Sequence, residues 1–74
     1  MIFSKKRAEK RFLQKKAEER NRLRRDIENL EAEIRRTETV FNLATDEYLL
    51  ESAIYEHNAQ QAKMNYLLKL AKEI

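Results

Sequence analysis

Apolar residues recur in the first half of the chain at alternating steps of four and three. The series extends weakly backward through Leu13 and Ala17, and its main run is Leu23, Ile27, Leu30, Ile34, Thr37 and Phe41. Such steps place side chains on one stripe of an α-helix. The spacing predicts a first amphipathic helix over about residues 5–41.

The apolar pattern breaks at residues 42–45, which read Asn-Leu-Ala-Thr. Thr45 is the expected cap of a second helix, because its side chain can accept a hydrogen bond from the first turn. Asp46 and Glu47 then place negative charge in that turn, where the helix dipole favours it. The second helix is predicted over about residues 46–73.

A short connection between two helices favours an antiparallel packing, so the expected fold is an all-α, coiled-coil-like two-helix hairpin. If residues pair one for one backward from the turn, the second helix covers the first only to about residue 14. The domain prediction is therefore a basic overhanging arm over residues 1–13 and a helical hairpin over residues 14–74. Nothing in residues 42–45 compels a turn, so one continuous helix is the alternative.

The second helix carries apolar residues on two opposite sides. The side expected to face the first helix holds Leu49, Leu50, Ala53, Ile54, His57, Gln61, Met64, Leu67, Leu68 and Ala71. The opposite side holds Tyr48, Ser52, Tyr55, Ala59, Ala62, Tyr66 and Leu70. Tyrosine offers a large contact area and alanine permits close helix approach. We therefore predict a protein interface, termed the tyrosine stripe, formed by Tyr48, Tyr55, Ala59, Ala62 and Tyr66. The alternative is that the three tyrosines are ordinary solvated surface residues.

The small size of the chain favours association. A chain of 74 residues rarely encloses a sufficient core alone, and the absence of cysteine removes disulfides and thiolate metal sites as sources of stability. A homo-oligomer is therefore expected, most simply a homodimer that forms a four-helix bundle. The tyrosine stripe could serve this self-association or an unknown protein partner.

Charge is unevenly distributed along the chain. Residues 1–25 contain eleven cations and three acids (+8), whereas residues 26–74 contain five cations and ten acids (−5), which gives the net charge of +3. The candidate phosphate contacts are Lys5, Lys6, Arg7, Lys10, Arg11, Lys15 and Lys16. Such a positive helix attracts phosphate backbones regardless of sequence, so nucleic-acid or ribosome binding is the alternative function. A membrane surface ranks lower because the apolar side of this segment is thin. A solvated cationic helix end explains the same charges without any ligand.

No enzyme chemistry is evident in the sequence. Glycine and proline are absent, which removes tight turns and phosphate-cradling loops. His57 is the only histidine, no acid is evident on its own helix face, and the glutamates lack the Glu-x-x-His pattern of di-metal bundles. We expect a non-enzymatic interaction or adaptor protein with no catalytic, metal or cofactor-binding residue and no cofactor. The lack of a long apolar run or signal peptide leads us to expect a cytoplasmic location.

From Phe41 onward the chain resembles a known group of proteins. The resemblance rests on Phe41-Asn42, Thr45-Asp46, Leu49-Leu50-Glu51, Ala53-Ile54-Tyr55-Glu56, Asn58-Ala59, Ala62-Lys63, Tyr66-Leu67-Leu68-Lys69 and Ala71-Lys72-Glu73. These segments are similar to the YaaL-like small helical proteins of Gram-positive bacteria, which have no established function. The resemblance implies a cytoplasmic bacterial helical protein in which Ile54-Tyr55-Glu56 is a signature of the fold or of a partner. It implies no catalytic residue.

Overall fold

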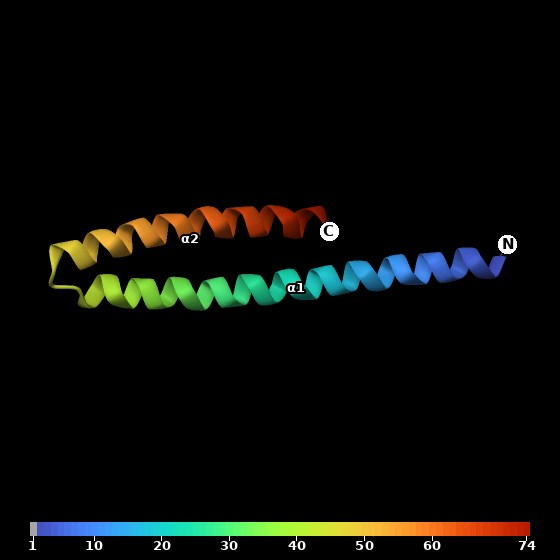
Figure 1. Ribbon diagram of the computed structural model, residues 1–74, viewed down its shortest axis with the longest axis horizontal. Helices are drawn as coiled ribbons and strands as arrows, with labels where there is room; N and C mark the ends of the chain where they lie inside the picture. Colours follow the sequence, from blue (N-terminus) through green and yellow to red (C-terminus); the bar gives the residue numbers. More distant parts are fainter. Residues whose placement is uncertain (1) are drawn as a thin grey trace.

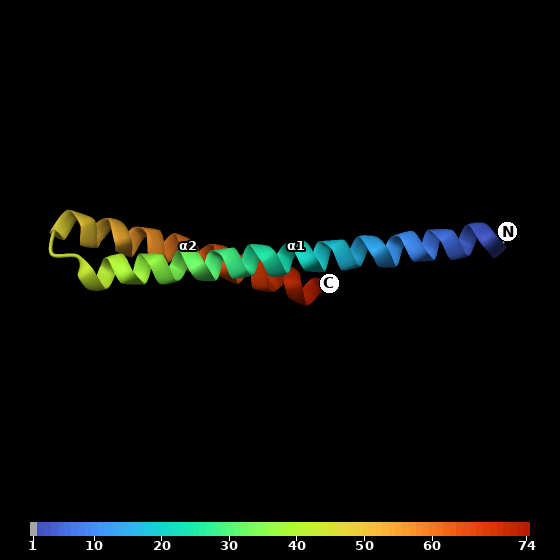
Figure 2. The same cartoon turned by 90° about the horizontal axis from the view of Figure 1, so that it is seen from below.

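The computed structural model shows a hairpin of two α-helices, and it describes the backbone of residues 2–74 and the side chains of residues 7–74. Helix α1 spans Ile2–Leu43 and helix α2 spans Glu47–Glu73. The helices lie side by side and run in opposite directions (Figure 1). Seen from below, α2 crosses α1 at a shallow angle (Figure 2). The predicted all-α antiparallel hairpin is confirmed, and the alternative of one continuous helix is wrong.

Asp46, and not Thr45, caps α2. The Asp46 backbone is extended, with φ of −94° and ψ of 130°, and its side chain accepts a hydrogen bond of 2.9 Å from the Tyr48 amide. A carboxylate can accept this bond and also places negative charge against the helix N-terminus. The prediction of Thr45 as the cap is therefore wrong by one residue. At the other side of the turn, the Ala44 amide donates to the Val40 carbonyl at 2.8 Å.

The contact between the helices is a narrow seam with heptad spacing. Its buried residues are Leu30 and Thr37 on α1 and Ala53, Gln60 and Leu67 on α2. Half-buried residues alternate with them and complete the seam: Leu23, Ile27, Ile34, Leu50, His57 and Met64. This is the two-positions-per-heptad contact of a coiled coil. The predicted α1 stripe is confirmed from Leu23 to Thr37, whereas Phe41 is exposed.

The side of α2 that packs on α1 is narrower than the sequence predicts. Leu49, Ile54 and Leu68 were expected in the seam and are exposed, because one neighbouring helix covers only two positions per heptad. Gln60 is buried in the place expected for Gln61. Leu70, expected on the tyrosine side, is half-buried and lines a groove with Leu23. Ala71 is exposed.

A polar pair lies in the middle of the apolar seam. The Gln60 Nε2 group donates to Thr37 Oγ1 at 2.9 Å, and Thr37 Oγ1 donates to the Glu33 carbonyl at 3.1 Å. Thr37 and Gln60 are only 4% and 7% exposed. Gln60 Oε1 is buried and has no hydrogen-bond partner among the described residues. The pair sets Thr37 opposite Gln60 and so defines the register of the two helices.

This register leaves a long part of α1 uncovered. Counting from the Thr37–Gln60 pair places Ile74 opposite Leu23, and the end of α2 does lie against Glu19, Arg22 and Leu23. The start of α2 extends past the end of α1, which explains why the cover stops short of the predicted residue 14 (Figure 1). Residues 7–18 are therefore a single helix, here termed the single-helix segment. The division of the chain into domains at residue 13 stays a prediction.

Replacing Asp46 with alanine should destabilise the start of α2. The substitution removes the acceptor for the Tyr48 amide, and loss of such a cap costs about 0.5–2 kcal/mol. Thr45→Ala is the matched control and should leave the free energy of unfolding nearly unchanged. Urea denaturation followed by circular dichroism measures both. A larger loss for Thr45→Ala would contradict the assignment of the cap.

Thr37 and Gln60 should respond differently to substitution. Thr37→Val leaves the buried Gln60 amide without its partner and should lower the free energy of unfolding by about 1–3 kcal/mol. Gln60→Leu removes the unpaired Oε1 and leaves the Thr37 bond to Glu33 intact, so stability should stay equal or rise. The same denaturation measurement compares them. A Gln60→Leu variant as unstable as Thr37→Val would contradict this account.

Candidate functional site

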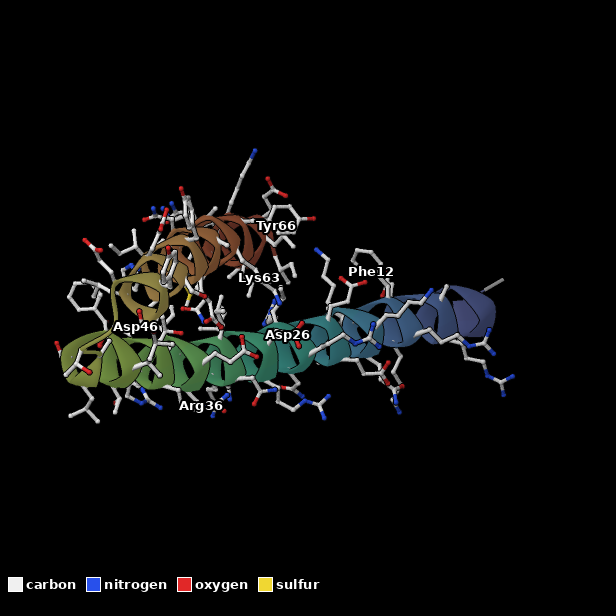
Figure 3. The ribbon with its side chains drawn as sticks, turned by 60° about the vertical axis from the view of Figure 1, so that its left-hand side comes forward. Phe12, Asp26, Arg36, Asp46, Lys63 and Tyr66 are labelled. Carbon is white, nitrogen blue, oxygen red and sulfur yellow. The ribbon has the colours of Figure 1, made fainter. Side chains whose placement is uncertain are left out.

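The five residues of the tyrosine stripe lie together on the side of α2 that faces away from α1. Tyr48, Tyr55 and Tyr66 are 83%, 67% and 60% exposed, and Ala59 and Ala62 are also exposed. Each tyrosine lies two residues from a seam position, which is about 200° around the helix. Figure 3 shows Tyr66 on the outer side of α2. The interface role of these residues stays a prediction.

A second apolar cluster surrounds the turn. Eleven large hydrophobic side chains are exposed among the described residues, and seven of these lie between residues 40 and 55. The seven are Val40, Phe41, Leu43, Tyr48, Leu49, Ile54 and Tyr55. Residues 37–62, here termed the acidic turn end, also contain five acids and no lysine or arginine. Sequence reasoning missed this cluster because it assigned Phe41, Leu49 and Ile54 to the seam.

One groove opens within the acidic turn end. It has a volume of about 210 Å³ and is termed the turn-end groove. Its lining is mostly apolar and comes from both helices: Thr37, Glu38, Phe41, Ala53, Ile54, His57 and Asn58. The large Phe41 of α1 and the small Ala53 of α2 both line it. An apolar side chain from another molecule could enter it.

His57 and Glu38 lie at this groove. His57 Nε2 is 3.8 Å from Glu38 Oε1, a distance beyond that of a hydrogen bond, and both side chains are partly exposed. The two attract each other electrostatically when the imidazole is protonated, although an exposed pair contributes little to stability. No acid was expected on the helix face of His57, because Glu38 comes from the other helix and only the register brings the two together. The described residues contain no cluster of three or more metal-ligating side chains.

The single-helix segment combines positive charge with exposed apolar groups. Lys16 Nζ lies 4.8 Å from the centre of the Phe12 ring, a cation–π contact. Phe12 and Leu13 are 59% and 65% exposed. Figure 3 shows Phe12 on the side of α1 that α2 covers further along the helix. No part of α2 covers it.

The predicted phosphate contacts are spread along this segment. Arg7, Lys10, Arg11 and Lys15 are exposed and Lys16 is half-buried, whereas the side chains of Lys5 and Lys6 lie outside those that the structure describes. The charges follow the helix without forming an enclosed pocket. Their role in phosphate binding stays a prediction.

The comparison with protein families covers both helices and the basic start. The family model described as a protein of unknown function (DUF2508) matches residues 1–74. The chain belongs to the DUF2508 family. No curated protein and no solved structure matches this DUF2508 chain. Its expected relation to YaaL-like proteins and its Gram-positive origin stay predictions.

Within residues 2–74, neither helix contains a stretch that is long and apolar enough to cross a bilayer. The apolar residues of α1 and α2 instead form stripes along otherwise polar helices.

Proposed function

We propose that this DUF2508 protein is a small, non-enzymatic adaptor that binds another protein through its tyrosine stripe. The observation that supports the proposal is the exposure of all three tyrosines of the chain along one side of α2. Tyrosine and other aromatic residues are enriched where proteins meet, because their rings bury a large area and their hydroxyl groups hydrogen-bond.

The spacing of the stripe suits a partner helix. Ala59 and Ala62 lie between Tyr55 and Tyr66 and are exposed on the same side. Small side chains allow a second backbone to approach closely, and the rings on either side can then pack around it. Aromatic residues such as tyrosine, when they lie near the centre of an interface, often carry most of the binding energy.

Substitution of the tyrosines should remove binding without unfolding the hairpin. The double variant Tyr55→Ala with Tyr66→Ala, immobilised on a support, should retain roughly tenfold less of the partner protein than immobilised wild type does. The reason is that each lost ring is an interface anchor. Gln61→Ala, an exposed residue on a different side of α2, is the matched control. Circular dichroism should show equal helicity for all three proteins.

Tyrosine fluorescence gives a second measurement of partner binding. Because the chain has three tyrosines and no tryptophan, its intrinsic fluorescence comes from the stripe alone. Binding of the captured protein should change this emission. The proposal fails if wild type and Tyr55→Ala are both stable monomers by light scattering and neither recovers a protein in a pull-down.

The exposed cations of the single-helix segment favour a second candidate function, binding to nucleic acid or the ribosome. Four exposed cations on one helix can each neutralise a phosphate. Sequence-specific readout is not supported, because Phe12 is the only aromatic residue among the described side chains of this segment.

Filter binding across a salt series tests this second candidate. If four phosphates are neutralised, affinity for RNA should fall with salt at a logarithmic slope of roughly −3 to −4. Lys10→Gln with Lys15→Gln should reduce that slope, and Lys69→Gln with Lys72→Gln on α2 is the matched control. Absence of binding at low salt would exclude this function.

A further inference from the structure

We infer that two copies of this chain associate side by side and antiparallel, with the single-helix segment of each copy lying on the acidic turn end of the other. In this arrangement Phe12 and Leu13 of one copy occupy the turn-end groove of the second. The inference goes beyond the proposed function, because no residue of the tyrosine stripe lines the turn-end groove. The stripe stays available for a different protein.

Charge complementarity identifies a second copy as the occupant. The single-helix segment, residues 7–18, contains five cations and two acids (+3), whereas residues 37–62 contain five acids and no lysine or arginine (−5). The two regions lie toward opposite ends of a rod 68 Å long and about 15 Å wide. An antiparallel pair therefore brings opposite charges together at both ends, and a parallel pair brings like charges together.

The charge layout of α1 is unfavourable for the isolated helix. Its first turn has no acid and its last turn has no base, although the helix dipole favours acids at the N-terminus and bases at the C-terminus. The cations are instead concentrated in the first half of α1. An acidic partner lying along this half offsets the unfavourable interaction.

The apolar groups of the two regions also match. The exposed Phe12 and Leu13 project from the segment, and the groove is lined by Phe41, Ala53 and Ile54. A cation accompanies the ring, since Lys16 Nζ is 4.8 Å from its centre. An acid accompanies the groove, since Glu38 lines it. Entry of the Phe12 ring into the turn-end groove would thus bring the Lys16 ammonium group toward the Glu38 carboxylate.

The single-helix segment is short enough to lie within the acidic turn end. Residues 47–62, the α2 part of the acidic turn end, span about 24 Å, whereas the single-helix segment has twelve residues and spans about 18 Å. A helix that packs on nothing is marginal in water at this length, so the uncovered segment gains stability from a partner. The arrangement has two-fold symmetry and uses each surface once, so it closes as a dimer.

Charge reversal with complementation tests the proposed contact. One variant carries Lys15→Glu and Lys16→Glu, and the other carries Glu38→Lys and Glu51→Lys. The first variant changes the single-helix segment from +3 to −1, and the second changes the acidic turn end from −5 to −1. Each variant alone therefore loses the attraction between opposite charges at both ends and should dimerise roughly tenfold more weakly than wild type. In an equimolar mixture, the mixed dimer pairs the unsubstituted segment (+3) with the unsubstituted turn end (−5) at one end, and the new glutamates with the new lysines at the other. The mixture should therefore dimerise more strongly than either variant alone, measured by sedimentation velocity at low salt.

Apolar substitutions have matched controls on the same chain. Phe12→Ala should weaken the dimer, whereas Tyr66→Ala, which removes an equally exposed ring, should not. Ile54→Ala in the groove should weaken it, whereas Leu49→Ala, an exposed leucine outside the groove, should not. Circular dichroism of each variant checks that α1 and α2 remain folded.

Several results would overturn the inference. These are a monomeric wild type at low salt, a mixture of charge variants that stays monomeric, or a dimer abolished by Tyr66→Ala and unaffected by Phe12→Ala. RNA binding through the basic residues in a protein that never self-associates would also overturn it. Tyrosine fluorescence separates the two proposals: dimerisation through the groove should leave it unchanged, and partner binding through the stripe should alter it.

Discussion

The buried hydrogen bond between Thr37 and Gln60 fixes how the two helices align, and the exposed surfaces of the molecule follow from that alignment. Most of the seam is apolar and would tolerate sliding by one heptad. Sliding would separate the two side chains and leave Gln60 Nε2, like Gln60 Oε1, buried without a partner, which is costly. The observed register leaves residues 7–18 uncovered at one end and projects the start of α2 past α1 at the other.

The sequence predicted the architecture well because the α1 pattern is strict. Leu23, Ile27, Leu30 and Ile34 follow heptad steps without interruption, and the absence of glycine and proline leaves helix as the consistent local structure. The capping residues at the break in the apolar pattern, Thr45 and Asp46, were enough to place the turn within two residues of its observed position. Thr45 and Asp46 are both good caps by composition, so only the backbone geometry distinguishes them.

The surfaces were harder to predict than the helices. On α2 the leucines and Ile54 suggest a wide apolar side, yet a single neighbouring helix fully buries only Ala53, Gln60 and Leu67. Sequence hydrophobicity therefore pointed to the wrong centre for the seam and exchanged Gln60 with Gln61. The proximity of His57 to Glu38 depends on the register, which hydrophobicity alone did not specify. The exposed side of the tyrosine stripe was predictable because all three rings lie well away from any seam position.

A narrow seam also explains why apolar and charged groups are concentrated where they are. Two helices bury few side chains, and even the best-covered residues here, Leu30 and Ala53, are the small core of an extended rod. Apolar residues that do not fit the seam remain on its flanks, as Ile54 and Leu68 do. An arrangement in which such flanks are covered by a second copy needs a means of preventing unlimited stacking. Opposite charges at the two ends of the rod provide it, because they favour one antiparallel pair in which each basic segment meets one acidic turn end, and a third copy then finds neither region free.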